Sequence, residues 1–157
     1  MSILHLHLLL NHIPVIGALV AVILFGAALV GRKAVSTKFA LAFSAGLALV
    51  AVSVYFTGGA AEEAVEKLAG VTERSIERHE EAAELATVAI GILGGLSLIA
   101  LFLFRGQRMP RWVALSGLVS TVIVAALMGW TANLGGQIRH TEIRGTFSQQ
   151  PDTHVED

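Results

Sequence analysis

Four long apolar runs, each close to the length of a membrane span, dominate this sequence. They cover about residues 3–30, 39–56, 82–104 and 112–134. A helix needs about 20 apolar residues to cross the hydrocarbon core of a bilayer. The chain has 157 residues, of which 54% are hydrophobic and 15% charged, and a soluble domain of this length is far more polar. The sequence therefore predicts an all-α integral membrane protein that forms an up-down four-helix bundle.

The rest of the chain is short. We expect residues 1–136 to form one domain of four transmembrane helices and residues 137–157 to form a polar outer tail. The connection 60–81 is rich in Glu, Arg and Ala at helical spacing, with a break at Gly70, which favours two short surface helices. Pro14 predicts a kink near the start of the first helix, because proline lacks a backbone donor and disturbs the preceding turn.

The distribution of charge predicts the orientation of the bundle. Two of the three connections are purely basic, carrying Arg32, Lys33 and Lys38 in one and Arg105, Arg108 and Arg111 in the other. Of the 12 acidic residues, 11 lie in the third connection or in the tail, and Glu84 lies just after that connection, at the start of the third span. Basic turns face the cytoplasm. We therefore expect a multi-pass protein of the bacterial inner membrane, with both termini and the 60–81 connection on the outer, periplasmic side.

Composition argues against several classes of function. The chain has no cysteine, which excludes disulfides, thiolate metal sites, iron–sulfur clusters and covalent c-type haem within it. A net charge of −1 argues against a nucleic-acid partner, which would need a basic face. No nucleotide-binding glycine motif is present. We expect no independent catalytic activity, although the sequence does not decide this.

The histidines gather at one predicted face of the membrane. Five of the six lie at the outer end of a predicted span: His5, His7, His12, His79 and His140. His79 sits in an apolar stripe of its helix and is predicted to face the bundle interior. A polar side chain at membrane depth is costly and usually has a partner or a ligand. The pattern therefore indicates a binding site near the outer leaflet.

Neutral imidazole is an axial ligand of haem iron and a ligand of transition metals. In an up-down bundle the first and third helices lie diagonally across the core. We therefore predict that His12 and His79 are the axial ligands of a b-type haem, with His5 and His140 as further cofactor-binding candidates. His7 and His154 are interpreted as structural or solvated.

A metal site without haem is the first alternative. Copper, zinc or iron would be held by histidines and carboxylates at the same face, namely His12, His79, His140, Glu80 and Glu84.

A second alternative is a cofactor-free accessory subunit of a membrane complex. Small residues let membrane helices approach closely, and Gly91, Gly94 and Gly95 would then form the contact surface. The same glycines, with Gly17, could instead make space for a flat macrocycle. The sequence leaves both interpretations open.

One segment resembles a known family. Residues His7 to Pro14, HLLLNHIP, resemble the HPLLVHFP-like opening of a widespread uncharacterised group of four-helix bacterial membrane proteins, with His7 and His12 matching its two histidines. Later landmarks of that group are matched by Thr57, Gly58, His79, Gly135, Gly136 and His140. Asn11 and Ile13 depart from the group's pattern, and His140 lies closer to its glycine pair than is usual there.

Members of this group are often fused to or encoded with cytochrome c-like domains. The resemblance therefore implies haem binding or electron transfer. Since no histidine lies at the cytoplasmic side, we expect electron exchange at the outer side, with a redox membrane complex, a periplasmic cytochrome or a quinone. Besides the lipid bilayer these are the expected partners, and a homo-oligomer is compatible with the sequence.

Overall fold

The computed structural model describes residues 3–31, 34–65 and 71–139. This part of the chain is helical apart from short turns. The helices are α1 (Ile3–Leu10), α2 (His12–Gly31), α3 (Ala34–Val65), α4 (Glu73–Leu103) and α5 (Arg111–Arg139).

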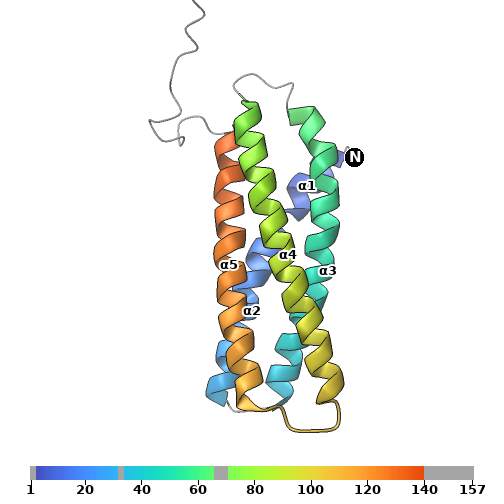
Figure 1. Cartoon of the computed structure of the whole chain (residues 1–157), viewed down its shortest axis with the longest axis vertical. Coiled ribbons are helices and arrows are strands. Elements are labelled where there is room, and N and C mark those ends of the chain that lie inside the picture. The colour runs from blue at the N-terminus through green and yellow to red at the C-terminus, as the bar shows by residue number, and fades with distance from the viewer. Residues whose placement is uncertain (1–2, 32–33, 66–70, 140–157) are drawn as a thin grey trace, which may run out of the picture.

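The four long helices form an up-down bundle (Figure 1). Each long helix packs against the next one along the chain, and α5 closes the bundle against α2. No Cα atom of α2 lies within 8 Å of a Cα atom of α4, so these helices are diagonal partners, in agreement with the sequence prediction. The short helix α1 packs on α3 and α2 only. It lies at the end of the bundle opposite the α4–α5 connection (Figure 1).

All four long helices are long and apolar enough to cross a membrane. At most 44% of the most apolar window of any of them is buried inside the bundle. Large aliphatic and aromatic side chains therefore point outward, and Val30, Ile23 and Phe102 are 87%, 68% and 68% exposed. An apolar exterior of this extent is what a multi-pass membrane protein presents to lipid.

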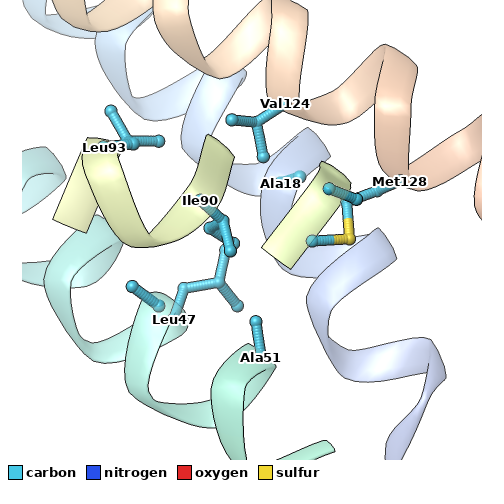
Figure 2. Packing of buried hydrophobic residues seen from close by; sticks show 9 residues of the cluster. Ala18, Leu47, Ala51, Ile90, Leu93, Val124 and Met128 are labelled. Carbon is cyan, nitrogen blue, oxygen red and sulfur yellow. The ribbon is translucent and has the colours of Figure 1, made fainter. Parts of the chain in front are cut away.

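Two apolar clusters fill the interior. The cluster nearer α1, which we call the histidine-side cluster, is built around Leu47, Ile90 and Met128 (Figure 2). The second, the basic-side cluster, is built around Phe25 and Leu41. Small residues bring the helices together between these side chains. Adding a Cβ atom to Gly94 would make it collide with the Cβ atom of Ala48, so α3 and α4 are in near-backbone contact there.

The predicted kink is present as a break between two helices. α1 ends at Leu10 and α2 begins at His12, with Asn11 between them. Pro14 stands in the first turn of α2, where its missing N–H is tolerated. Asn11 is in the N-cap position, but Pro14 removes one of the two N–H groups that an N-cap oxygen normally accepts from. The Oδ1 atom of Asn11 is buried without a hydrogen-bond partner.

Helices α3 and α4 extend further than the predicted spans. The second span was expected to end at residue 56, but α3 continues through Thr57, Gly58 and Gly59 to Val65. The third was expected to begin at residue 82, but α4 begins at Glu73. The described parts of the 60–81 connection thus prolong the spans instead of forming separate surface helices. Ala and Glu are strong helix formers, and they outweigh the cost of about 1 kcal/mol per interior glycine.

The two basic connections lie at the same end of the bundle (Figure 1), which we call the basic end. Lys38, near the start of α3, donates a hydrogen bond of 3.0 Å to the backbone carbonyl of Arg105, just after α4. A lysine is well placed there because the C-terminus of a helix carries a partial negative charge. The opposite end, which carries α1, is called the histidine end below.

Candidate functional site

His7 is held by a side chain of the neighbouring helix. Its Nδ1 atom lies 3.1 Å from the hydroxyl oxygen of Thr57 on α3. The Thr57 hydroxyl in turn donates its proton to the backbone carbonyl of Val54, at 2.7 Å. A threonine hydroxyl has one proton to give. Its oxygen therefore accepts from His7, and the proton of a neutral His7 is on Nδ1.

His79 is held by a backbone group. Its Nδ1 atom lies 3.1 Å from the carbonyl oxygen of Thr131 on α5. A carbonyl only accepts, so Nδ1 of His79 carries a proton and donates it. The Thr131 hydroxyl donates back across the same interface to the carbonyl of Ala82, at 3.0 Å, and also to Leu127 of its own helix. These reciprocal bonds tie α4 to α5 beside the histidine.

The two histidines therefore share one chemical state. In a neutral imidazole whose proton is on Nδ1, the Nε2 atom has a free lone pair. A hydrogen bond from Nδ1–H to a carbonyl or hydroxyl oxygen also fixes the orientation of the ring and raises the basicity of Nε2, as it does in many metal-ligating histidines. In this tautomer, the Nε2 atoms of His7 and His79 can each donate a lone pair to a metal ion.

His7 on α1 and His79 on α4 both lie at the histidine end of the bundle. Their helices do not pack directly against each other, since no Cα atom of α1 comes within 8 Å of a Cα atom of α4. Both rings are half-buried.

A glycine flanks each ring. A Cβ atom on Gly58 would lie 3.4 Å from Cε1 of His7, and a Cβ atom on Gly135 would lie 3.0 Å from Cε1 of His79. The second distance is tighter than nine in ten contacts of real Cβ atoms. The absence of a side chain at Gly135 therefore lets His79 take its observed position.

The other predicted ligands within the described residues are exposed. His12, at the start of α2, is exposed, and so are His5, Glu80 and Glu84. His140 and His154 lie outside the described residues. The break at Asn11 also places His5 and His12 in different helices. Among the histidines at this end, His7 and His79 are thus the partly buried ones within the described residues, and the choice of His12 as a ligand stays a prediction.

The predicted glycines divide into two pairs. A Cβ atom on Gly17 would collide with Leu47, and one on Gly94 with Ala48. These two glycines serve the close approach of α2 and α4 to α3. A Cβ atom on Gly91 or Gly95 would meet nothing within 4 Å, so both of these face open space.

A metal ion without haem would need a different donor set. Among the described residues no group of three or more His, Cys, Asp or Glu side chains could hold a metal ion. Structural zinc sites use four protein ligands and catalytic zinc sites three. The histidine pair supplies two nitrogen donors.

Comparisons with protein-family models, with curated proteins and with solved structures give no match.

Sequence reasoning overlooked the groups that position the histidines. Thr57 and Thr131 look like ordinary residues of membrane helices, where hydroxyls usually bond to their own backbone. One signal was available, since the family resemblance pairs His7 with Thr57, Gly58, His79 and Gly135. His7 was nevertheless interpreted as structural, because a continuous first helix would have directed it away from His5.

Proposed function

We propose that this protein is a membrane-integral electron-transfer subunit that binds a b-type haem between His7 and His79 at the histidine end of the bundle. The observation that carries the proposal is the matched pair of imidazoles, each with Nδ1 bonded to an oxygen atom and Nε2 left as a lone-pair donor. His7 and His79 would together supply the two protein ligands that hold a b-type haem. The resemblance to a group associated with cytochrome c-like domains points the same way.

The number of donors favours haem over a bare metal ion. Two histidines complete the coordination of haem iron, whereas copper or zinc held by protein alone would need further ligands. Glycine at position 135 is also suited to a crowded site, since even a methyl group would press on the ring of His79. When bound, haem would supply one-electron redox chemistry.

The residues of this chain would then have distinct tasks. Thr57 and the Thr131 carbonyl orient the two rings and keep their protons on Nδ1. Stronger hydrogen bonding to Nδ1 makes Nε2 a better donor to iron and favours the oxidised state, so these oxygens would help set the reduction potential.

The depth of the site is indicated by two exposed tryptophans on α5. Trp112 and Trp130 are 63% and 47% exposed, and their 18-residue separation corresponds to about 27 Å along a helix. This is close to the thickness of the hydrocarbon core, and tryptophan favours its two boundaries. Thr131, which holds His79, follows Trp130 directly. The proposed haem would therefore lie at a membrane–water boundary.

The distribution of charge supports an outer-side position for that boundary. The basic end would face the cytoplasm by the positive-inside rule, so the histidine end would face the periplasm of a bacterial inner membrane. Electron exchange would take place there, with a redox complex, a periplasmic cytochrome or a quinone. A single haem at one face cannot by itself carry electrons across the membrane.

The test is a reduced-minus-oxidised visible spectrum of the purified protein, with iron, copper and zinc measured on the same sample. We expect sharp α and Soret bands with one iron per chain. His7→Ala and His79→Ala should each abolish the low-spin spectrum while the protein stays in the membrane. His12→Ala is the matched control, because this exposed histidine should be dispensable.

Other results would overturn parts of the proposal. Loss of the bands in His12→Ala with retention in His7→Ala would reject the ligand pair and support His12 instead. Bound copper or zinc without haem would show a metal-binding protein. Absence of any cofactor from protein purified from its native membrane would reject the proposed function and favour an accessory subunit.

A further inference from the structure

Three hydroxyl groups are buried between the two apolar clusters. Ser44 on α3, Ser97 on α4 and Thr121 on α5 have exposed fractions of 0%, 1% and 0%. Among the described residues, the other buried polar side chain is that of Thr37, near the basic end. A polar side chain in this position calls for a partner, because neither lipid nor apolar neighbours can satisfy it.

The three hydroxyls lie between the two clusters along their own helices. Each has a member of the histidine-side cluster about one turn away on one side: Leu47, Leu93 and Val124. Each has a residue of the basic-side cluster, or one packed against it, about one turn away on the other side: Leu41, Ala100 and Leu118. Because α4 packs against both α3 and α5, Ser97 lies on the helix between the other two.

Two of the three hydroxyls have already donated their only proton. Ser44 donates to the carbonyl of Ala40 at 2.9 Å. Thr121 donates to the carbonyls of Gly117 and Leu118, each at 2.9 Å. Their oxygens can still accept a hydrogen bond. This layer therefore holds unused acceptors on both sides of α4.

Ser97 is different, because its Oγ atom is fully buried and has no hydrogen-bond partner. A serine within a helix commonly donates to the carbonyl four residues earlier, as Ser44 does. A buried hydroxyl that makes no bond retains the whole cost of its removal from water. The layer thus contains one unsatisfied donor on α4 and an unused acceptor on each of its two neighbouring helices.

We propose that this layer binds one internal water molecule, held by Ser97 and donating to the oxygens of Ser44 or Thr121. Internal waters typically make two to four hydrogen bonds to buried polar groups of this kind. A metal cation is a poorer occupant, since the layer consists of neutral hydroxyls and an uncompensated charge is expensive at this depth. The water would link three helices through side chains that otherwise bond only within their own helix.

A crystal structure at about 2 Å of the full chain and of Ser97→Ala tests the proposal directly. We expect an isolated density peak within hydrogen-bonding distance of Ser97 Oγ and of at least one other hydroxyl, which is lost in the variant. A Ser97 hydroxyl bonded to a carbonyl of α4, or directly to Ser44 or Thr121, with no such peak, would overturn the proposal.

Unfolding equilibria in detergent provide a second measurement. If Ser97 holds a water that links helices, Ser97→Ala should shift the unfolding equilibrium about threefold towards the unfolded state, the usual size for an interhelical hydrogen bond in a membrane. Ser53→Ala is the matched control, because Ser53 is exposed and donates within its own helix. An equal or more stable Ser97→Ala protein would show that the hydroxyl is unsatisfied and would reject the water site. The site involves no histidine, so its outcome is independent of haem binding.

Discussion

At the scale of single residues, His7 and His79 differ in the group that fixes them. The acceptor for His7 is a side chain, Thr57, whereas the acceptor for His79 is a backbone carbonyl. A substitution can remove the first and cannot remove the second. The two halves of the proposed haem site can therefore be weakened separately.

Thr57→Val should loosen the His7 side of the site. Valine keeps the shape of threonine but accepts no hydrogen bond, so the proton of His7 is no longer fixed on Nδ1. Loss of such a supporting bond typically lowers metal affinity about 10- to 100-fold, and haem titration of the apoprotein should show a decrease of this order. Thr57→Ser should restore the affinity. Equal haem affinity in the valine and serine variants would contradict the role of Thr57.

Gly135→Ala should disturb the His79 side. Its Cβ atom would lie 3.0 Å from Cε1 of His79, so the ring must shift by a few tenths of an ångström. We expect weaker haem binding and a changed low-spin electron paramagnetic resonance signal. Gly129→Ala on the same helix is the control, because its Cβ atom would meet nothing within 4 Å. A Gly135→Ala spectrum identical to wild type would indicate that the ring has room to move.

The residue scale is where prediction from sequence was weakest. The sequence placed histidines at one end of the bundle, and His79 is half-buried there. The choice between His7 and His12 depended on where the first helix breaks, because a break changes the direction of every side chain before it. Pro14 indicated a kink, and in the structure the break falls at Asn11, three residues before it.

At the scale of helices, a glycine of α4 lets the backbones of α3 and α4 approach closely in the core. A Cβ atom on Gly94 would collide with Ala48, while a Cβ atom on the adjacent Gly95 meets nothing. Neighbouring glycines in one turn thus have opposite environments.

Gly94→Ala should therefore force α3 and α4 apart. Overpacking of this kind costs about 1–3 kcal/mol, measurable as a shift in the unfolding equilibrium in detergent. Gly95→Ala adds a methyl group where there is room, and alanine is a better helix former than glycine. Its free energy of unfolding should lie within about 0.5 kcal/mol of that of the wild type. Equal stability of the two variants would show that Gly94 and Ala48 do not hold α3 and α4 in tight contact.

Helix ends were predicted less well than helix existence. Thr57, Gly58 and Gly59 were read as the end of the second span, since glycine pairs commonly end helices. In the structure α3 runs through them, and Thr57 and Gly58 contact His7 instead. A glycine pair that lies beside a ring within a helix cannot be separated by sequence pattern from a glycine pair that ends a helix.

At the scale of the whole molecule, the bundle has two chemically different ends. The basic end carries Lys38, Arg105, Arg108 and Arg111, and the histidine end carries exposed acids on the first turns of α4, including Glu73 and Glu77. The number of spans, their order and the diagonal relation of α2 and α4 were all predictable, because apolar runs of span length and short connections leave few arrangements.

Sidedness can be tested with single cysteines, since the chain has none of its own. In intact cells of a Gram-negative host, Thr72→Cys at the histidine end should react with a membrane-impermeant maleimide that has passed the outer membrane. Gln107→Cys at the basic end should react only after the inner membrane is opened. Both positions are exposed. The reverse labelling pattern would place the histidine end in the cytoplasm.

The groups that hold the two histidines come from both ends of the polypeptide. His7 is near the beginning of the chain, its acceptor is on α3, His79 is on α4, and the carbonyl that orients His79 is on α5. During synthesis the first histidine is thus made more than a hundred residues before the last group of the site. A nascent chain would have to wait for its final helix before it could retain a cofactor, so loading would be a late step of biogenesis and a truncated chain would be released empty.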